Sequence, residues 1–193
     1  MAGGESSRMG RDKALLELQG IPLIVRAARL LETVVGVPTV VGYREDFHAL
    51  GLRTIADDAP CAGPLGGIAT ALHAAHAPWS LIIACDLPYL TQAWLEFLAS
   101  RAKDSKADAV IPMNERGAEP LCAVYNKRAE QVIREALARG TRKITDALAG
   151  ARIEAIEPRE WKAFESEGVL FKNMNSPADY EESKARLGGS SRK

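Results

Sequence analysis

Residues 2–13 form a glycine-rich segment whose side chains suit the binding of phosphate groups. Gly3 and Gly4 carry no Cβ, so their backbone N–H groups can approach phosphate oxygens closely and positive φ angles are accessible. Arg8 and Lys13 add positive charge, Arg8 as a planar fork and Lys13 as a compact ammonium. The spacing matches neither the GxGxxG fingerprint nor the GxxxxGK[ST] loop. The same composition also fits a flexible polar terminus.

A carboxylate, Asp86, closely follows residues 80–84, an apolar segment typical of a buried strand. Ligands of open α/β sheets gather at the carboxyl ends of the strands. Mg²⁺ prefers a few hard oxygen ligands together with substrate phosphates and water. The position of Asp86 therefore predicts a metal ligand next to a phosphorylated substrate. The alternative is an Asp that caps a helix or a turn before Pro88.

Two amides, Asn173 and Asn175, lie at alternate positions, so in an extended segment they face the same side. Amide oxygens can ligate a metal or hold substrate phosphates without adding charge. For Asn175, a turn that leads into a helix capped by Ser176 is almost equally good.

Residues 63–67, Gly-Pro-Leu-Gly-Gly, open a predicted helix. Small residues there allow a base or ribose to lie against the backbone, and a helix N-terminus favours anionic groups. Asp57 and Asp58 precede this segment. A carboxylate in that place can accept hydrogen bonds from guanine N1–H and the 2-amino group, a donor pair that cytosine lacks. We prefer Asp57 for this role, with Asp58 as a solvated loop residue.

The elements that must position these residues alternate between helices and strands, a pattern typical of an α/β sheet with helices on both faces. The predicted helices cover residues 22–35, 65–77, 129–137 and 176–187, and a further helix, capped by Thr91, carries Leu95, Leu98 and Ala102 on one face. Gly140 and Ser176 are predicted to cap two of them. The predicted strands cover residues 37–43, 53–56, 80–84, 107–112, 121–125, 153–156 and 169–172. Residues 114–119 are expected to be polar and mobile.

Composition limits the class of protein further. The chain has 193 residues with 25 basic and 25 acidic side chains, a balance that argues against capture of nucleic acid by a basic face. Cys61, Cys85 and Cys122 are odd in number and form no CxxC pair, so neither a disulfide framework nor a zinc site is expected. No apolar run approaches the ~20 residues of a membrane span, and no export signal is present. We expect a cytoplasmic protein with one domain, residues 1–187, and a disordered tail, residues 188–193.

Four segments resemble, in order and spacing, the molybdenum cofactor guanylyltransferase family, also called the molybdopterin-guanine dinucleotide biosynthesis protein A family. They are residues 2–16 (Ala-Gly-Gly-x-Ser-Ser-Arg-Met-Gly-x-Asp-Lys-Ala-Leu-Leu), residues 63–67, residues 85–88 (Cys-Asp-Leu-Pro) and residues 173–177 (Asn-Met-Asn-Ser-Pro). The resemblance spans nearly the whole chain. It implies an α/β, Rossmann-like nucleotidyltransferase fold with a mostly parallel twisted sheet and helices on both faces.

The resemblance also implies roles for the residues above. Asp86 would hold Mg²⁺, and Asn173 and Asn175 would contact the pterin substrate, with Asn175 completing the metal site. The expected catalytic residues are Lys13, Arg8 and Asp86. The expected nucleotide-binding residues are Ala2, Gly3, Gly4, Lys13, Asp57, Gly63, Pro64, Leu65 and Asp86.

The reaction that the resemblance implies is transfer of GMP from GTP to the phosphate of molybdopterin, with release of pyrophosphate and Mg²⁺ as the cofactor. The expected partners are GTP, molybdopterin and proteins that deliver the cofactor or mature molybdoenzymes, but neither nucleic acid nor a membrane. One alternative is a cytidylyltransferase for the same cofactor, although that family typically has Ala-Ala-Gly where this chain has Ala2-Gly3-Gly4. Others are a sugar-phosphate nucleotidyltransferase and a non-catalytic carrier of the nucleotide or cofactor.

The chain departs from the family at its start. In the family, the glycine-rich loop follows a buried apolar first strand, whereas Met1 directly precedes Ala2 and the glycines here. A sheet without that strand would expose ladder groups and apolar side chains at large cost. We therefore expect that the first strand is absent from this chain and that the natural protein starts several residues upstream.

Overall fold

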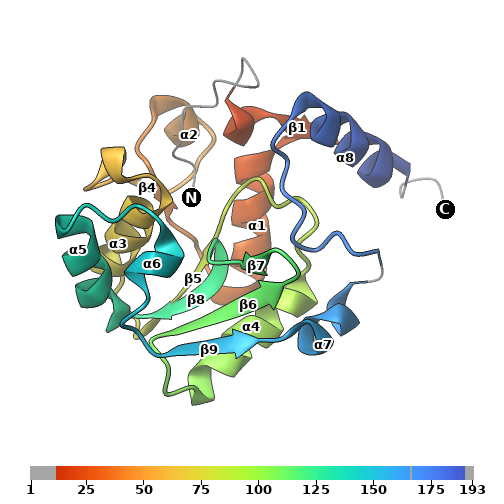
Figure 1. The fold of residues 1–193 in the computed structure, drawn as a ribbon. Coiled ribbons are helices and arrows are strands. Elements are labelled where there is room, and N and C mark those ends of the chain that lie inside the picture. Colours follow the sequence, from red (N-terminus) through yellow and green to blue (C-terminus); the bar gives the residue numbers. More distant parts are fainter. Residues whose placement is uncertain (1–11, 166, 190–193) are drawn as a thin grey trace.

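Short strands alternate with helices along the part of the chain that the computed structural model describes, residues 12–165 and 167–189 (Figure 1). The helices are η1 Lys13–Leu15, α1 Leu23–Val35, α2 Glu45–Ala49, η2 Pro60–Ala62, α3 Pro64–Ala74, α4 Gln92–Asp104, α5 Ala129–Ala138, α6 Ile144–Ala147, α7 Pro158–Trp161, η3 Lys162–Phe164 and α8 Pro177–Gly189. The strands are β1 Glu17–Leu18, β2 Ile21–Pro22, β3 Val40–Val41, β4 Thr54–Ile55, β5 Trp79–Ile83, β6 Ala109–Asn114, β7 Gly117–Ala118, β8 Cys122–Asn126 and β9 Ile153–Ile156.

The central sheet has the order β5-β8-β6-β7, and β9 also pairs with β6. β8 is antiparallel to β5 on one side and to β6 on the other, whereas β9 is parallel to β6. The predicted α/β nucleotidyltransferase fold is confirmed, but the prediction of a mostly parallel sheet is wrong. The sheet is mixed because β8 follows β6 through the β7 hairpin and returns in the opposite direction. As a result, β5 and β6 run parallel and end at the same edge of the sheet.

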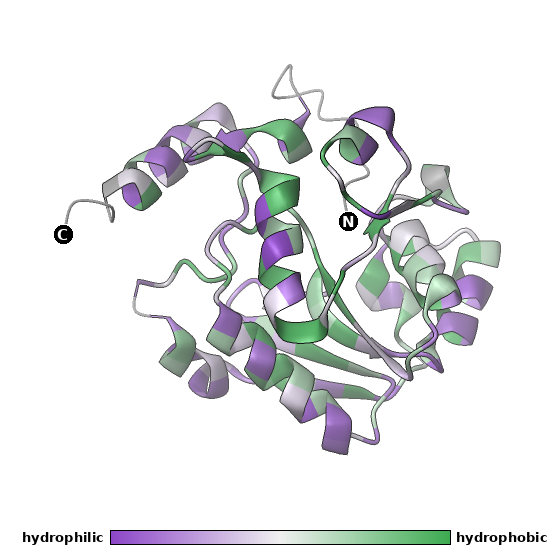
Figure 2. Cartoon of the chain, turned by 180° about the vertical axis from the view of Figure 1, so that it is seen from behind, coloured by the Kyte–Doolittle hydropathy of each residue, from purple (hydrophilic) through white to green (hydrophobic). Residues whose placement is uncertain are grey.

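Helices cover both faces of this sheet, as predicted. Ala109 and Ile111 of β6 face one core together with Leu65 and Leu72 of α3, while Val110 faces a second core. The period of two along a strand therefore divides the interior between two cores. Figure 1 shows α3 and α5 at one side of the sheet, with α1 and α4 behind it. Seen from behind in Figure 2, α1 and α4 carry hydrophilic residues on their outer surfaces.

Smaller pieces complete the fold. β3 and β4 form a separate parallel pair, shorter than the predicted strands 37–43 and 53–56, and among the described residues no ladder joins this pair to the central sheet. The β1–β2 hairpin packs against α8, where Tyr180 Oη donates to Glu17 O at 2.8 Å. The predicted absence of a first strand concerns residues that lie outside the described range.

The predicted helix caps are confirmed. Thr91 Oγ1 accepts a hydrogen bond from Trp94 N at 3.3 Å, and Ser176 Oγ accepts one from Asp179 N at 3.2 Å. Gly140 has φ 85° just beyond α5 and donates to Leu137 O at 2.9 Å. α8 continues to Gly189, two residues beyond its predicted end.

Two connections differ from the predictions. Residues 169–172 do not form a strand, because the side chain of Glu165 accepts hydrogen bonds from Val169 N and Leu170 N at 2.8 and 3.4 Å. These donors are therefore satisfied locally rather than by a neighbouring strand. Residues 114–119 belong to a hairpin rather than an irregular connection: β6 continues to Asn114 and turns into β7 at Gly117, whose φ is 119°.

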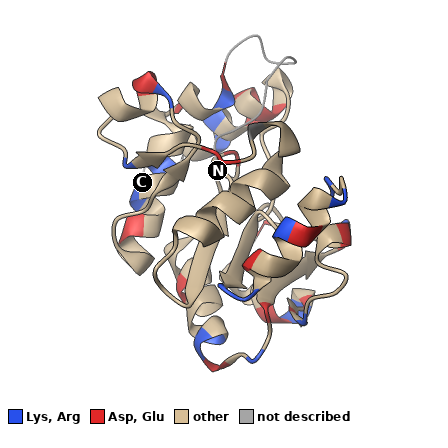
Figure 3. Cartoon of the chain, turned by 90° about the vertical axis from the view of Figure 1, so that its left-hand side faces the viewer, with Lys and Arg blue, Asp and Glu red and all other residues tan. Residues whose placement is uncertain are grey.

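Charged residues of both signs lie interspersed over the helices and loops in Figure 3, consistent with the balanced composition. No helix in the described part of the chain has both the length and the apolar character needed to cross a membrane.

Candidate active site

Asp86 lies just beyond the end of β5, at the edge of the sheet where β6 also ends. Its side chain is half-buried, and its backbone oxygen accepts a hydrogen bond from Met174 N at 2.9 Å. Burial raises the pKa of the Asp86 carboxyl, while the positive charge of Lys13 acts in the opposite direction. A partly buried carboxylate whose charge is incompletely compensated is a suitable ligand for a cation.

Lys13 is positioned by the short helix η1. Asp12 caps this helix, and its Oδ1 accepts a hydrogen bond from Ala14 N at 2.9 Å. Lys13 Nζ donates to Asn175 Oδ1 at 2.8 Å. The structure thus brings together Lys13, Asp86 and Asn175, three residues singled out from separate sequence segments.

The two asparagines flank a buried residue. Met174 is 1% exposed and packs in a small core with Leu18 and Leu23, while Asn173 and Asn175 are both exposed. Asn175 N also donates to the side chain of Asp179 at 3.0 Å, which leads the chain into α8. The turn predicted at Asn175 is therefore confirmed, and its amide oxygen accepts a hydrogen bond from Lys13, while its role towards a metal or substrate stays a prediction.

Arg44, which the sequence analysis did not identify, stabilises the segment that begins at Asp12 and carries Lys13. Its guanidinium forms ion pairs with Asp12 and Asp46 and lies over the ring of Phe47, 4.6 Å from the centroid. Because Asp12 caps η1, Arg44 fixes the backbone that carries Lys13. No spacing rule connects residues 12 and 44, so the sequence offers no signal for this contact.

Glu119 is a second half-buried carboxyl at this edge, and it too was missed. Burial raises its pKa, the charge of Asp86 acts in the same direction, and a hydrogen bond from Asn114 Nδ2 opposes the shift. Glu119 lies beyond the β6–β7 hairpin in a segment that was expected to be mobile, which concealed its position near Asp86.

In the loop before α3, the two candidate base-reading residues, Asp57 and Asp58, have different surroundings. Asp57 Oδ1 accepts hydrogen bonds from Thr70 Oγ1 and Ala59 N, both at 2.9 Å, and Thr70 is 3% exposed. Asp58 is exposed, and its Oδ2 lies 3.7 Å from Arg134 of α5. The buried hydroxyl of Thr70 therefore fixes the orientation of Asp57, whereas Asp58 turns towards a neighbouring helix.

The predicted glycine-rich turn into α3 has a tight geometry. Gly63 has φ 62°, a conformation that favours glycine, and Pro64 occupies the first helical turn. A Cβ on Gly66 would lie 2.4 Å from Ala59 O, so only glycine fits there. Leu65 is fully buried in the core.

Four predicted site residues, Ala2, Gly3, Gly4 and Arg8, lie outside the described residues.

The oxygen donors of Asp86 and Asn175 fit Mg²⁺, which uses one or two carboxylates and leaves room for substrate phosphates. No group of three His, Cys, Asp or Glu side chains within residues 12–165 and 167–189 could hold a metal ion. A magnesium site here would therefore depend on phosphate oxygens supplied by the substrate.

Comparisons with known proteins show the family to which the chain belongs. The family model described as "MobA-like NTP transferase domain" matches residues 1–153. The chain is 32% identical to a protein of Pelotomaculum thermopropionicum, over 93% of this chain and 87% of the relative, and 35% identical to one of Natronomonas pharaonis, over 97% and 96%. Both relatives are named "Probable molybdenum cofactor guanylyltransferase". The crystal structure of molybdopterin-guanine dinucleotide biosynthesis protein A from Archaeoglobus fulgidus superposes with a TM-score of 0.85 at 25% identity, covering 97% of this chain and 96% of that one.

Proposed function

Since this chain belongs to the MobA-like NTP transferase family, we propose that it transfers GMP from GTP to the phosphate of molybdopterin and releases pyrophosphate. The observation that carries the proposal is the convergence of Lys13, Asp86 and Asn175 where β5 ends. A cation, a half-buried carboxylate and an amide in one place suit two phosphorylated substrates and a divalent metal.

In the proposed reaction, a phosphate oxygen of molybdopterin attacks the α-phosphorus of GTP. A new phosphorus–oxygen bond forms as the bond from the α-phosphorus to the departing pyrophosphate breaks. A phosphate monoester is largely ionised near neutral pH, so the attacking oxygen needs no general base. The protein must therefore align the two substrates and stabilise charge rather than form a covalent intermediate.

The roles of the individual residues in this proposal are those that the family resemblance implies. The ammonium of Lys13 stabilises negative charge as it moves onto pyrophosphate, aided by Arg8 and by the backbone N–H groups of Gly3 and Gly4. The oxygens of Asp86 and Asn175 would hold Mg²⁺. When bound, the ion offsets the charge of the α-phosphate and of the leaving group.

Recognition of guanine is assigned to the loop before α3. The carboxylate of Asp57 accepts hydrogen bonds from guanine N1–H and the 2-amino group, while Gly63, Pro64 and the N–H of Leu65 line the place of the base and ribose. The orientation that Thr70 imposes on Asp57 supports this assignment over Asp58. We also assign the protein to the cytoplasm, because its three free cysteines suit a reducing compartment.

Pyrophosphate release tests the proposal. The protein is incubated anaerobically with molybdopterin, Mg²⁺ and either GTP or CTP, and pyrophosphate and the dinucleotide product are measured. We expect product from GTP only, loss of turnover with a chelator, and recovery on addition of Mg²⁺. Activity only with CTP would overturn the assignment of the base, and binding of both substrates without turnover would identify a carrier.

A matched pair of variants tests the base-reading residue. Asp57→Asn retains an oxygen that can accept from Thr70 but lacks the carboxylate, so we expect weaker GTP binding and less discrimination against CTP. Asp58→Asn is the control and should leave both unchanged. The reverse result would assign the base to Asp58.

A further inference from the structure

A cavity of about 470 Å³ opens beside the Asp86 site and includes none of the residues assigned above. Four segments contribute to its wall: the β6–β7 hairpin with Arg116, α7 and η3 with Trp161 and Lys162, the loop with Phe171 and Lys172, and α8 with Glu182 and Arg186. Its volume lies in the range of sites for small organic ligands, about 300–1,000 Å³.

Aromatic rings form a fixed part of this wall. The rings of Trp161 and Phe171 meet edge to face with their centroids 4.9 Å apart, and both residues are largely buried. Trp161 Nε1 donates to Met113 O at 2.7 Å, which ties α7 to β6. Such a surface is formed before a ligand arrives and suits a planar ring system.

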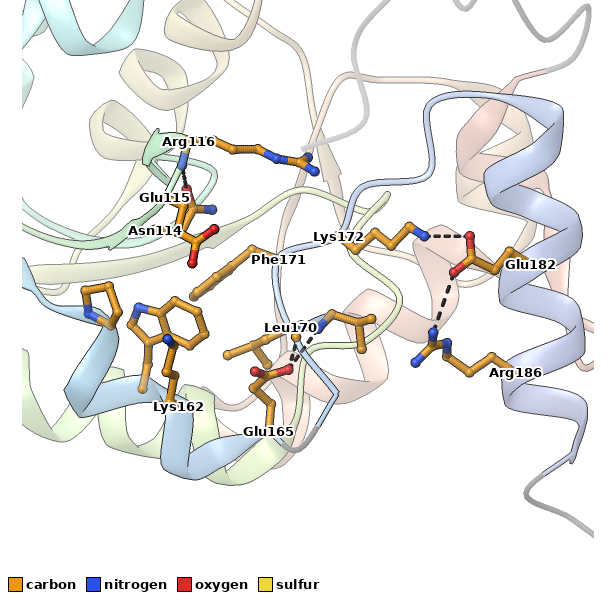
Figure 4. Close-up of a pocket in the computed structure, with 14 residues that line it drawn as sticks. Asn114, Glu115, Arg116, Lys162, Glu165, Leu170, Phe171, Lys172, Glu182 and Arg186 are labelled. Atoms are coloured by element: carbon orange, nitrogen blue, oxygen red, sulfur yellow. Dashed lines mark hydrogen bonds and ion pairs between the residues drawn. The ribbon is translucent and has the colours of Figure 1, made fainter.

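Charged side chains of both signs lie around these rings, and the glutamates among them are Glu115, Glu165 and Glu182. Figure 4 shows Phe171 and Lys172 pointing to opposite sides of their loop, with Lys172 directed to Glu182 of α8. Glu165 is used by the backbone of its own loop, where it accepts from Val169 N and Leu170 N. Arg116 and Lys162 are exposed, and the charge of Arg116 also acts on Glu119. Two exposed cations beside an apolar wall favour a ligand that combines a ring with an anionic group.

The segments that line the cavity also reach the Asp86 site. The hairpin that carries Arg116 leads to Glu119, whose pKa is affected by the charge of Asp86. The loop that carries Phe171 and Lys172 continues to Met174, whose N–H donates to Asp86 O. Two of the segments that line the cavity therefore continue into residues that contact Asp86 or act on its charge.

We infer that this cavity binds the ring end of the acceptor, a planar pterin heterocycle, while the acceptor's phosphate passes Arg116 on the way to Lys13. The inference rests on the proposed function, which requires a phosphorylated pterin at the Asp86 site. It adds Trp161 and Phe171 as the surface that receives the rings and Arg116 as a phosphate-binding side chain.

The test measures binding of molybdopterin by anaerobic calorimetry without nucleotide, so that it does not depend on turnover. Arg116→Ala removes an exposed cation, and we expect molybdopterin binding to weaken about tenfold while GTP binding stays unchanged. Val169→Trp places a large side chain in the cavity and should weaken molybdopterin binding at least as much. The controls are Lys103→Ala, which removes an exposed cation from α4, and Val37→Trp, which adds an indole at a site that is 69% exposed.

Two results separate this inference from the proposed function. If wild-type protein transfers GMP but Arg116→Ala and Val169→Trp bind molybdopterin as wild type does, the cavity is not the acceptor site and the function stands. The second result is that the wild-type protein transfers no nucleotide, but binds molybdopterin more tightly than the two variants do. In that case the cavity is supported as the molybdopterin site and the transferase proposal is overturned. If Val169→Trp does not fold, the result for Arg116→Ala decides whether the cavity binds molybdopterin. This variant is expected to fold because the side chain of Arg116 makes no hydrogen bond or ion pair within the described residues.

Discussion

At the two edges of the central sheet, the pKa values of carboxyl groups are shifted in opposite directions. At the edge where β5 and β6 end, burial raises the pKa of both Asp86 and Glu119. At the opposite edge, where β6 begins and β8 ends, hydrogen bonds from basic side chains lower the pKa of Asp108 and of Glu130 to about 2, although burial opposes the shift. The same residue type is therefore destabilised as an anion at one edge and stabilised at the other.

Hydrogen bonds to neighbouring residues explain the lowered pKa values at the edge where β6 begins. Asp108 accepts hydrogen bonds from Arg152 N at 3.0 Å and from Arg128 Nε at 3.1 Å, joining the starts of β6 and β9 to the turn after β8. Glu130 accepts from His73 at 2.8 Å and from Arg134 at 2.9 Å, which links α5 to α3. These carboxylates are fully used within the fold.

The first edge leaves its carboxylates available. The one cation that acts on Asp86 among the described side chains is Lys13, whose ammonium donates a hydrogen bond to Asn175 Oδ1 instead. A site that must receive a metal and phosphates cannot satisfy its charges internally without losing its ligands. The difference between the edges separates residues that hold the fold from residues that await substrate.

The largest effect is expected at Asp86. Asp86→Asn should lower the rate of GMP transfer by about 100-fold or more, because the carboxylate proposed to hold Mg²⁺ is lost. The folded pKa is raised, so the ionised form costs folding free energy above that pKa, and the variant should melt at a higher temperature than wild type near neutral pH. Thermal melting and pyrophosphate release measure both. A lower melting temperature would contradict the account of this edge.

At the opposite edge, Asp108→Asn should destabilise without affecting catalysis. Lowering its pKa from 3.8 to about 2 corresponds to about 2 kcal/mol after allowance for the exposed arginines. The folded pKa is depressed, so this contribution is present above the unfolded pKa and is lost as the pH falls from about 4 to about 2. Urea unfolding at pH 7 and pH 3 checks the value. If variant and wild type were equally stable at pH 7, Asp108 would not stabilise the fold, and the proposed difference between the two edges would be wrong.

Arg44→Ala sharpens the comparison by testing how Lys13 is held. Loss of the ion pair with Asp12 should loosen η1 and lower turnover roughly tenfold, with a smaller change in GTP affinity. Arg44→Lys should restore part of the rate because it keeps the charge but not the planar fork. Turnover equal to wild type in Arg44→Ala would show that Lys13 is positioned without this contact.

The smallest effect is expected for Glu119→Gln. The amide keeps an acceptor for Asn114, so stability at pH 7 should change by less than about 0.5 kcal/mol. The raised pKa of Glu119 makes wild-type stability decline as the pH rises through that value, and the variant should lose part of this decline. Unfolding between pH 5 and pH 7 measures the slope. Glu115→Gln, an exposed residue of the same hairpin, is the control.

Local signals predicted much of this fold. The helix caps Thr91 and Ser176 and the C-terminal Gly140 were identified from residue types whose conformations depend on a few neighbouring backbone groups. The resemblance carried by four segments is confirmed by the matching family and relatives. Asp86 lies just beyond β5, where the rule that ligand sites form at strand ends predicted it, whereas Asn175 was placed at this site only by the resemblance.

Other features depend on contacts that the sequence does not encode locally. The apolar segment 169–172 has the composition of a strand, but its donors bond to Glu165 and its Phe171 packs against Trp161. The direction of β8 depends on the hairpin formed at Gly117. Arg44 reaches Asp12 only after α2 has packed, so no pattern in the sequence reveals it.

The hydrogen bond between Lys13 and Asn175 joins residues 162 positions apart in the chain. During synthesis, the glycine-rich segment, the sheet and the cavity wall all leave the ribosome before Asn175 does. The complete set of side chains can therefore assemble only after Asn175 has been synthesised, as a late closure of high contact order. A nascent chain that has folded its sheet would bind neither substrate productively until α8 and the β1–β2 hairpin meet.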